Sequence, residues 1–150
     1  MLEYTIEEAA AMTAVGFKRR FKNDTAYLEI PKFWEEWMEN SRGIMGMFGI
    51  CVDTDGNEFD YWIADPYDPE KGVPEGCEKI EIPGGLWAEF PCRGPLPESL
   101  QSVNTRIWSE WLPDLKGYEL AAGYTVEVYL PPAEDPKDTL SYIRIPIKKK

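Results

Sequence analysis

Glu127 is the residue whose type and surroundings point most directly to chemistry. It lies in the run Thr125–Leu130, in which Val126, Val128 and the final leucine alternate with polar residues. Because successive side chains of a strand point to opposite faces, we expect the apolar set beneath the helices and Glu127 with Tyr129 on the other face. A carboxylate framed by aromatic rings attracts an organic cation through charge and cation–π contact.

Aromatic residues in other runs extend this frame. The same alternation predicts that Tyr142 and Arg144 share the face of Glu127, with Trp87 in the run before the second helix. The candidate ligand-binding residues are Glu127, Tyr142, Tyr129, Trp87, Tyr61, Trp111 and Phe59. The alternative is an ordinary solvated face, on which Glu127 and Arg144 form a surface ion pair worth about 0 to 1 kcal/mol.

Histidine is absent from the sequence, and this excludes several chemistries. A Ser-His-Asp or Cys-His nucleophile, a histidine-ligated zinc and a histidine haem ligand all need an imidazole. The three cysteines, Cys51, Cys77 and Cys92, form no Cys-x-x-Cys pair, and we expect free thiols in a reducing compartment. No catalytic residue, metal site or cofactor is therefore predicted, although Glu127 would be the base if the protein were a hydrolase.

The charge balance argues against a polyanionic partner. Among 150 residues, 27 acids outweigh 16 bases and give a net charge of −11, whereas binding to nucleic acid depends on Lys and Arg. We expect the two basic runs, 18–22 and 148–150, to be solvated edges. No apolar run approaches the roughly 20 residues that span a bilayer, so we expect a cytoplasmic protein that contacts neither membrane nor nucleic acid directly.

The order of predicted elements indicates an internal duplication. Two helices, 30–40 and 97–113, carry the related sequences FWEEWM and IWSEWL, which are half the chain apart. Each follows a predicted strand, 11–21 or 86–92. Two more strands follow each helix, 47–52 and 58–65 in the first half and 125–130 and 140–147 in the second.

This pattern predicts an α+β fold made of two β-α-β-β units with pseudo-two-fold symmetry, antiparallel sheets and two helices. Residues 66–76 are rich in Pro, Gly and acids and would link the halves, about 1–70 and 76–150. Because neither half is large enough to be independently stable, we expect a single domain over 1–150.

The sequence also resembles the GyrI-like effector-binding family, which includes the ligand domains of AraC-type and MerR-type multidrug regulators. The resemblance is strongest in the second half, and the first half matches through 48–50 and 59–61. The matching motifs are Gly76–Phe90, Cys92-x-Gly94, Trp108–Pro113, Gly117–Glu119, Val126–Tyr129 and Ile145–Lys148.

The resemblance implies a central cleft for lipophilic, often cationic, molecules, with Glu127 at its centre and Tyr142 as the ring from the last strand. Since no helix-turn-helix is present, the chain is similar to stand-alone drug-binding proteins of mobile gene cassettes. A regulatory role would need a separate DNA-binding or transcription partner, and homodimerisation stays open. Two alternatives also follow from the family: hydrolysis of strained electrophiles, and inhibition of gyrase by protein contact.

Overall fold

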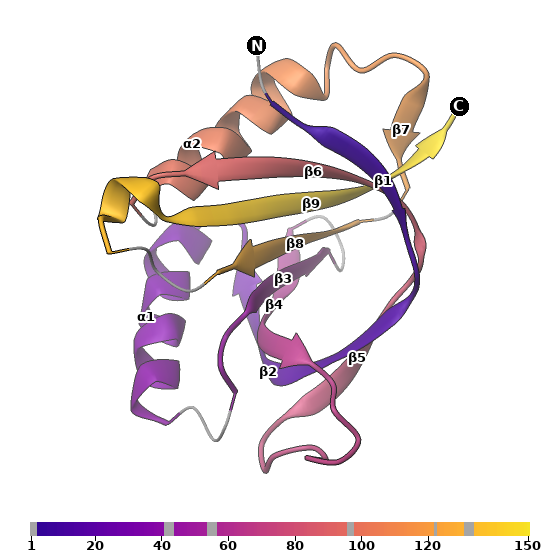
Figure 1. The fold of residues 1–150 in the computed structure, drawn as a ribbon. Helices are drawn as coiled ribbons and strands as arrows, with labels where there is room; N and C mark the ends of the chain where they lie inside the picture. The colour runs from indigo at the N-terminus through magenta and orange to yellow at the C-terminus, as the bar shows by residue number, and fades with distance from the viewer. Residues whose placement is uncertain (1–2, 41–43, 54–56, 96–97, 122, 131–133) are drawn as a thin grey trace. The chain divides into compact units, whose positions relative to one another are not determined.

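The computed structural model describes residues 3–40, 44–53, 57–95, 98–121, 123–130 and 134–150 (Figure 1). The chain divides into two compact units. The N-terminal unit comprises Ala11–Pro83, and the C-terminal unit combines Met1–Ala10 with Gly84–Lys150.

The N-terminal unit is a four-stranded antiparallel sheet with one helix. Its strands are in the order β3-β4-β2-β5. The elements are β2 (Met12–Lys22), α1 (Ala26–Glu39), β3 (Phe48–Asp53), β4 (Glu58–Pro66) and β5 (Glu78–Ile82).

Helix α1 packs on this sheet through an apolar stripe. Trp37 lies four positions after Phe33 and three after Trp34, and all three join the core that Val15 and Ile63 form on the strands. The helix begins one turn earlier than the predicted start at residue 30. Pro31 therefore lies inside the helix rather than in its first turn. At this interior position its missing N–H removes one backbone hydrogen bond of the helix.

The C-terminal unit is also an antiparallel sheet with one helical segment. Its strands are in the order β1-β6-β9-β8, and β7 also pairs with β9. The elements are β1 (Thr5–Ala9), β6 (Gly85–Arg93), α2 (Glu98–Arg106), β7 (Tyr118–Leu120), β8 (Tyr124–Tyr129) and β9 (Leu140–Lys149), with a 3₁₀ turn η2 (Pro136–Asp138).

The second helix differs from the prediction of one continuous α-helix. After α2 the chain enters a single π-helical turn, η1 (Ile107–Trp111), which is closed by the Leu112 N–H donating to the Ile107 carbonyl at 2.8 Å. The wider turn leaves both Ile107 and Trp111 buried against the sheet. Pro97, in the predicted first turn, lies outside the described residues.

The predicted β-α-β-β order is confirmed in both halves, and β1, β5 and β7 are additional strands. Strands β1 and β5 are exchanged between the two halves of the sequence. Strand β1 precedes β2 in the chain but pairs with β6, while β5 precedes β6 but pairs with β2. Each compact unit therefore contains a strand contributed by the other half of the sequence.

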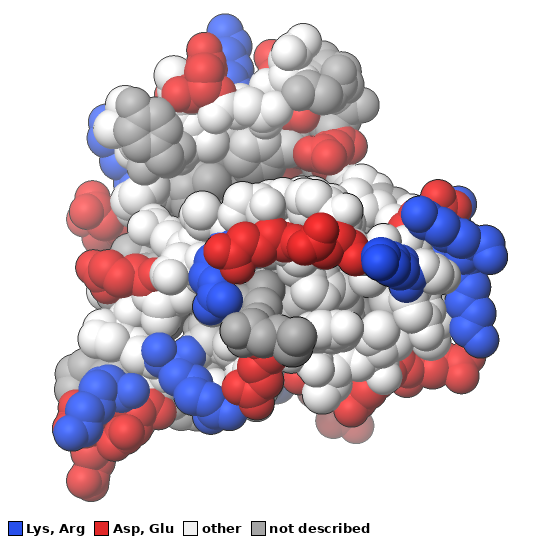
Figure 2. Space-filling model, turned by 90° about the horizontal axis from the view of Figure 1, so that it is seen from above, with Lys and Arg blue, Asp and Glu red and all other residues white. Residues whose placement is uncertain are grey.

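The basic run at 18–22 belongs to strand β2, and three of its basic side chains contact carboxylates. Lys18 lies 3.5 Å from a carboxylate oxygen of Glu78, Arg20 lies 3.0 Å from Asp60, and Arg19 is hydrogen-bonded to Glu36. Figure 2 likewise shows basic and acidic side chains interspersed on the face it presents. Neither α1 nor α2, the α-helices of the described ranges, has the length and apolar character needed to cross a bilayer.

Candidate functional site

Strand register places Glu127 on the face of its sheet that carries α2. Glu127 of β8 is the direct partner of Ile143 on β9, and Ile143 is the partner of Phe90 on β6. Partners in an antiparallel pair project to the same side. Because Phe90 and Ile143 pack in the core with the helical segment, Glu127 shares the helical face.

The prediction that the valines of β8 lie beneath the helix is therefore wrong. Val126 pairs with Arg144 and Val128 with Tyr142, so both valines lie on the face opposite to α2. They are nevertheless buried, at 3% and 5% exposure. Alternation separates the side chains of this strand into two sets, one on each face. It does not tell which face the helix covers, because the valines on the face without the helix are buried as well.

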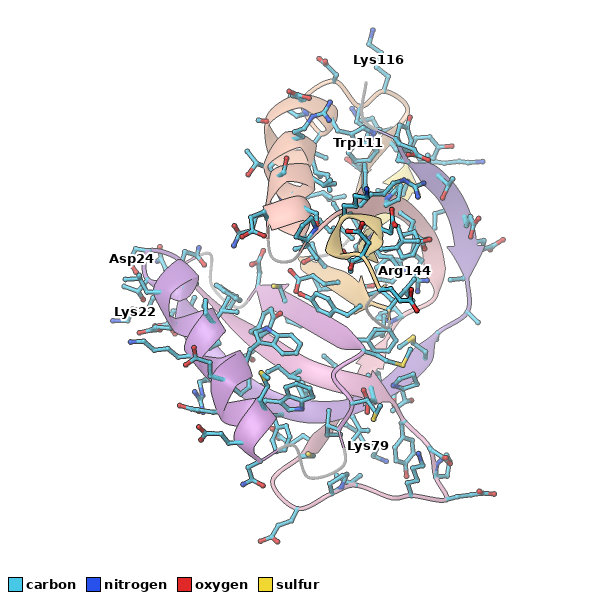
Figure 3. The ribbon with its side chains drawn as sticks, turned by 60° about the vertical axis from the view of Figure 1, so that its left-hand side comes forward. Lys22, Asp24, Lys79, Trp111, Lys116 and Arg144 are labelled. Carbon is cyan, nitrogen blue, oxygen red and sulfur yellow. The ribbon has the colours of Figure 1, made fainter. Side chains whose placement is uncertain are left out.

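Tyr142 does not share a face with Glu127, which corrects a second expectation. Arg144 also lies on the far face, where its Nε donates to Glu89 at 2.8 Å, so it is not a surface partner of Glu127 (Figure 3). The non-helical face also holds Trp87, which is 7% exposed and packs edge-to-face on Tyr124 with ring centroids 5.6 Å apart.

Two rows of side chains cross the helical face around Glu127. The first is Phe90, Ile143 and Glu127, and the second is Cys92, Ser141 and Tyr129. Each row runs over β6, β9 and β8. The carboxylate therefore lies beside a buried and largely apolar cluster, next to a short polar row.

Tyr129 orients the carboxylate. Its Oη donates a hydrogen bond to Glu127 Oε1 at 2.7 Å, and both side chains are half-buried. A phenol that donates to a carboxylate favours its ionised form and restricts its rotamers. The predicted pair Glu127 and Tyr129 is thus brought together, on the helical rather than the opposite face.

Trp111 lies on the same face but in the packed core. Its ring is edge-to-face with Phe90 at 4.9 Å and with Tyr4 at 5.2 Å, and it is 9% exposed. Figure 3 shows it reaching from the π-helical turn toward the strands of its unit. These contacts are those of a core residue, and one of them is with Phe90, which lies in the same row as Glu127.

Tyr61 and Phe59 belong to the N-terminal unit, where both lie on the face that carries α1. Tyr61 is 2% exposed, and its hydroxyl accepts a hydrogen bond from Trp34 Nε1 at 3.2 Å. Phe59 packs on Phe21 with ring centroids 6.1 Å apart. In this unit the two residues are part of the aromatic packing between helix and sheet.

The Cys92 thiol is buried and weakly acidic. Burial raises its pKa, the Ser141 hydroxyl opposes the rise because it would stabilise a thiolate, and the nearby charge of Glu127 adds to the rise, so that the pKa is about 11. The thiol is therefore protonated at neutral pH. This agrees with the sequence, in which no imidazole could serve Cys92 as a base.

We expect Cys92 to resist alkylation by iodoacetamide at pH 8 in the native protein, while the half-buried Cys51 and Cys77 react. The thiolate is the nucleophile, so the rate at Cys92 should rise only as pH approaches about 11. Peptide mass spectrometry after timed labelling measures this, with urea-unfolded protein as the control. Equal labelling of all three native thiols at pH 8 would contradict the burial of Cys92.

Ser141 is a residue of this surface that sequence reasoning missed. It is 1% exposed, lies between Cys92 and Tyr129 in the polar row, and is a diagonal neighbour of Glu127. The signal available in the sequence is a serine in phase with Ile143, Ile145 and Ile147, at a position where alternation predicts an apolar side chain.

The chain matches one protein family along nearly its whole length. The family described as "Integron-associated effector binding protein" matches residues 5–147. The transcriptional regulator BrlR of Pseudomonas aeruginosa is 28% identical over 111 residues, which are 67% of this chain and 38% of that regulator. The chain thus spans well under half the length of this curated relative.

Solved structures share the fold at low sequence identity. SAV2435, in a structure bound to tetraphenylphosphonium, has a TM-score of 0.83 at 19% identity, covering 98% of this chain and 94% of that one. The integron cassette protein VCH_CASS2, from the mobile metagenome of Vibrio cholerae, has a TM-score of 0.75 at 17% identity, covering 97% and 95%.

Proposed function

Because the chain belongs to the integron-associated effector binding protein family, we propose that it binds lipophilic organic cations and that Glu127 selects their positive charge. It is an effector-binding domain of the GyrI-like type, related to the ligand domains of transcription regulators, and such domains bind small molecules. The proposal specifies which molecules they are and which residue recognises them.

One observation carries this proposal: a half-buried carboxylate is oriented by a phenol at the edge of a buried apolar cluster. Glu127 lies in the row of Phe90 and Ile143, both of which are buried. Tyr129 holds one carboxylate oxygen at 2.7 Å. An apolar surface with one oriented anion suits a ligand that is mostly hydrocarbon and carries one positive charge.

The position of Glu127 also makes its charge effective. Two unit charges about 4 Å apart attract by about 1 kcal/mol in water and by about 4 kcal/mol at an effective dielectric constant near 20. A half-buried carboxylate beside packed aromatic and aliphatic side chains lies closer to the second case. The same carboxylate at a fully exposed position would give little selectivity.

The solved structure of SAV2435 with tetraphenylphosphonium supports the choice of ligand class. That compound is a cation shielded by four aromatic rings, so it has the properties that Glu127 and its apolar neighbours fit. The likeness to the transcriptional regulator BrlR supports a regulatory setting for this binding.

Glu127→Gln should weaken binding of tetraphenylphosphonium by at least about tenfold, or 1.4 kcal/mol. Triphenylphosphine oxide, which has similar rings and no net charge, should bind both proteins equally, because the substitution removes charge and preserves shape. The affinities are measured by isothermal titration calorimetry and by quenching of tryptophan fluorescence.

The matched control is Glu119→Gln, which removes the same charge from an exposed ion pair with Lys148 at 3.7 Å. It should change neither affinity by more than about twofold, since exposed charges are screened. An equal loss for both ligands in Glu127→Gln would refute charge selection. If Glu119→Gln lowered the affinity for tetraphenylphosphonium by the same factor, the net charge of the protein would explain the result instead of the position of Glu127.

A further inference from the structure

The hydroxyl of Ser141 is an unsatisfied polar group inside the C-terminal unit. The side chain is 1% exposed, and its Oγ has no hydrogen-bond partner among the described residues. Proteins leave few buried polar atoms unpaired, because such an atom loses its hydrogen bonds to water and gains nothing in return. An alanine at this place in the core would avoid that cost.

The neighbours of Ser141 already use their own donors. The Cys92 thiol donates to the Phe90 carbonyl at 3.6 Å, and the Tyr129 hydroxyl donates to Glu127 at 2.7 Å. Ser141 lies between these two residues in its row. Its hydroxyl can both donate and accept, so it suits a polar atom that arrives with a ligand.

Ser141 and Glu127 lie close enough to contact one ligand. They are diagonal neighbours on adjacent strands and project to the same face, a geometry that separates Cα atoms by about 7–8 Å. The charge of Glu127 acts on Cys92, which is the direct partner of Ser141 on the other side. A cationic centre at Glu127 would thus place a substituent one aromatic ring away near the Ser141 hydroxyl.

We propose that Ser141 is a second polar contact of the ligand site, and that the preferred ligands are lipophilic cations carrying a hydrogen-bonding group one aromatic ring away from the charged centre. This inference rests on the proposed function, since Glu127 anchors the cation. Tyr129, the direct partner of Ser141 on β8, is half-buried, so the polar row reaches solvent at this residue.

The test compares tetraphenylphosphonium with (3-hydroxyphenyl)triphenylphosphonium, which adds one hydroxyl to the same cation. The hydroxylated compound should bind the wild-type protein about tenfold more tightly, because it satisfies a buried partner. In Ser141→Ala the two compounds should bind with equal affinity. Calorimetric titration gives the ratio of the two dissociation constants for each protein.

Two further variants separate this inference from the proposed function. Glu127→Gln should weaken the binding of both phosphonium compounds and leave the ratio of their dissociation constants unchanged. Ser109→Ala, an exposed serine of the π-helical turn, should leave the ratio at its wild-type value. A wild-type ratio near one, or a ratio unchanged in Ser141→Ala, would overturn the role of Ser141 while Glu127 dependence stands. If neither compound binds the wild-type protein, the proposed function fails and this inference fails with it.

Discussion

Gly16→Ala should lower the free energy of unfolding by more than about 3 kcal/mol or prevent folding. A Cβ atom at Gly16 would lie 2.1 Å from the carbonyl oxygen of Ile63 and 2.6 Å from the Cα atom of Ala64. Both are backbone atoms of β4, which is paired on one side with β2 and on the other with β3. No side-chain rotation can relieve the overlap, so the strands would have to separate.

Urea and thermal denaturation, followed by far-ultraviolet circular dichroism, measure this loss. Gly117→Ala is the control: its φ of +82° strains an alanine, but nothing lies within 4 Å of the added atom. Left-handed strain alone costs about 1–2 kcal/mol. If Gly16→Ala is no less stable than Gly117→Ala, the close approach of β2 and β4 is contradicted.

Phe90→Ala should cost about 3–5 kcal/mol, the range for truncating a large buried aromatic ring. Phe90 is fully buried and contacts the rings of Trp111 at 4.9 Å and Tyr4 at 5.7 Å. Its loss opens a cavity beneath the π-helical turn. The cavity also adjoins Ile143, the neighbour of Glu127 in its row, so ligand affinity should fall together with stability.

Trp108→Ala is the matched control, since this ring is 43% exposed and belongs to the same helical segment. Truncating an exposed side chain changes stability by about 0.5 kcal/mol. Chemical denaturation monitored by circular dichroism compares the two variants without relying on tryptophan fluorescence. A loss in Phe90→Ala no larger than in Trp108→Ala would contradict the packing around Phe90.

Long periodic segments made most of the fold predictable. Phe33 and Trp37 mark one face of α1, and the isoleucines at 143, 145 and 147 mark one face of β9. The strands missed by the prediction, β1, β5 and β7, have at most five residues each and carry acidic side chains, as in β1 with Glu7 and Glu8. An edge strand of this kind buries few side chains, so it leaves little apolar periodicity to read.

The helix boundaries show a second limit. The sequence after Leu100 keeps an α-helical spacing, but the chain forms a π-helical turn at Ile107–Trp111. In this turn Trp111 packs against Phe90 and Tyr4, two residues far away in the sequence. Local spacing contains no information about such contacts.

Alternation predicted that Glu127 and Tyr129 share a face, but it did not predict which face of the sheet the helix covers. In the structure the two side chains are hydrogen-bonded on the helical face. The separation of Tyr142 from Glu127 depends on the register between β8 and β9, which a single sequence does not specify. The burial of Ser141 depends on the same register.

The exchange of β1 and β5 bears on how the chain folds during synthesis. Strand β1 is synthesised before its partner β6, and the whole N-terminal unit is translated between them. At ordinary translation speeds this delay lasts several seconds, and through that time β1 is an unpaired strand. Its two adjacent glutamates, Glu7 and Glu8, then act as gatekeepers that discourage pairing with other nascent chains. The charged edge is thus most useful before the native sheet exists.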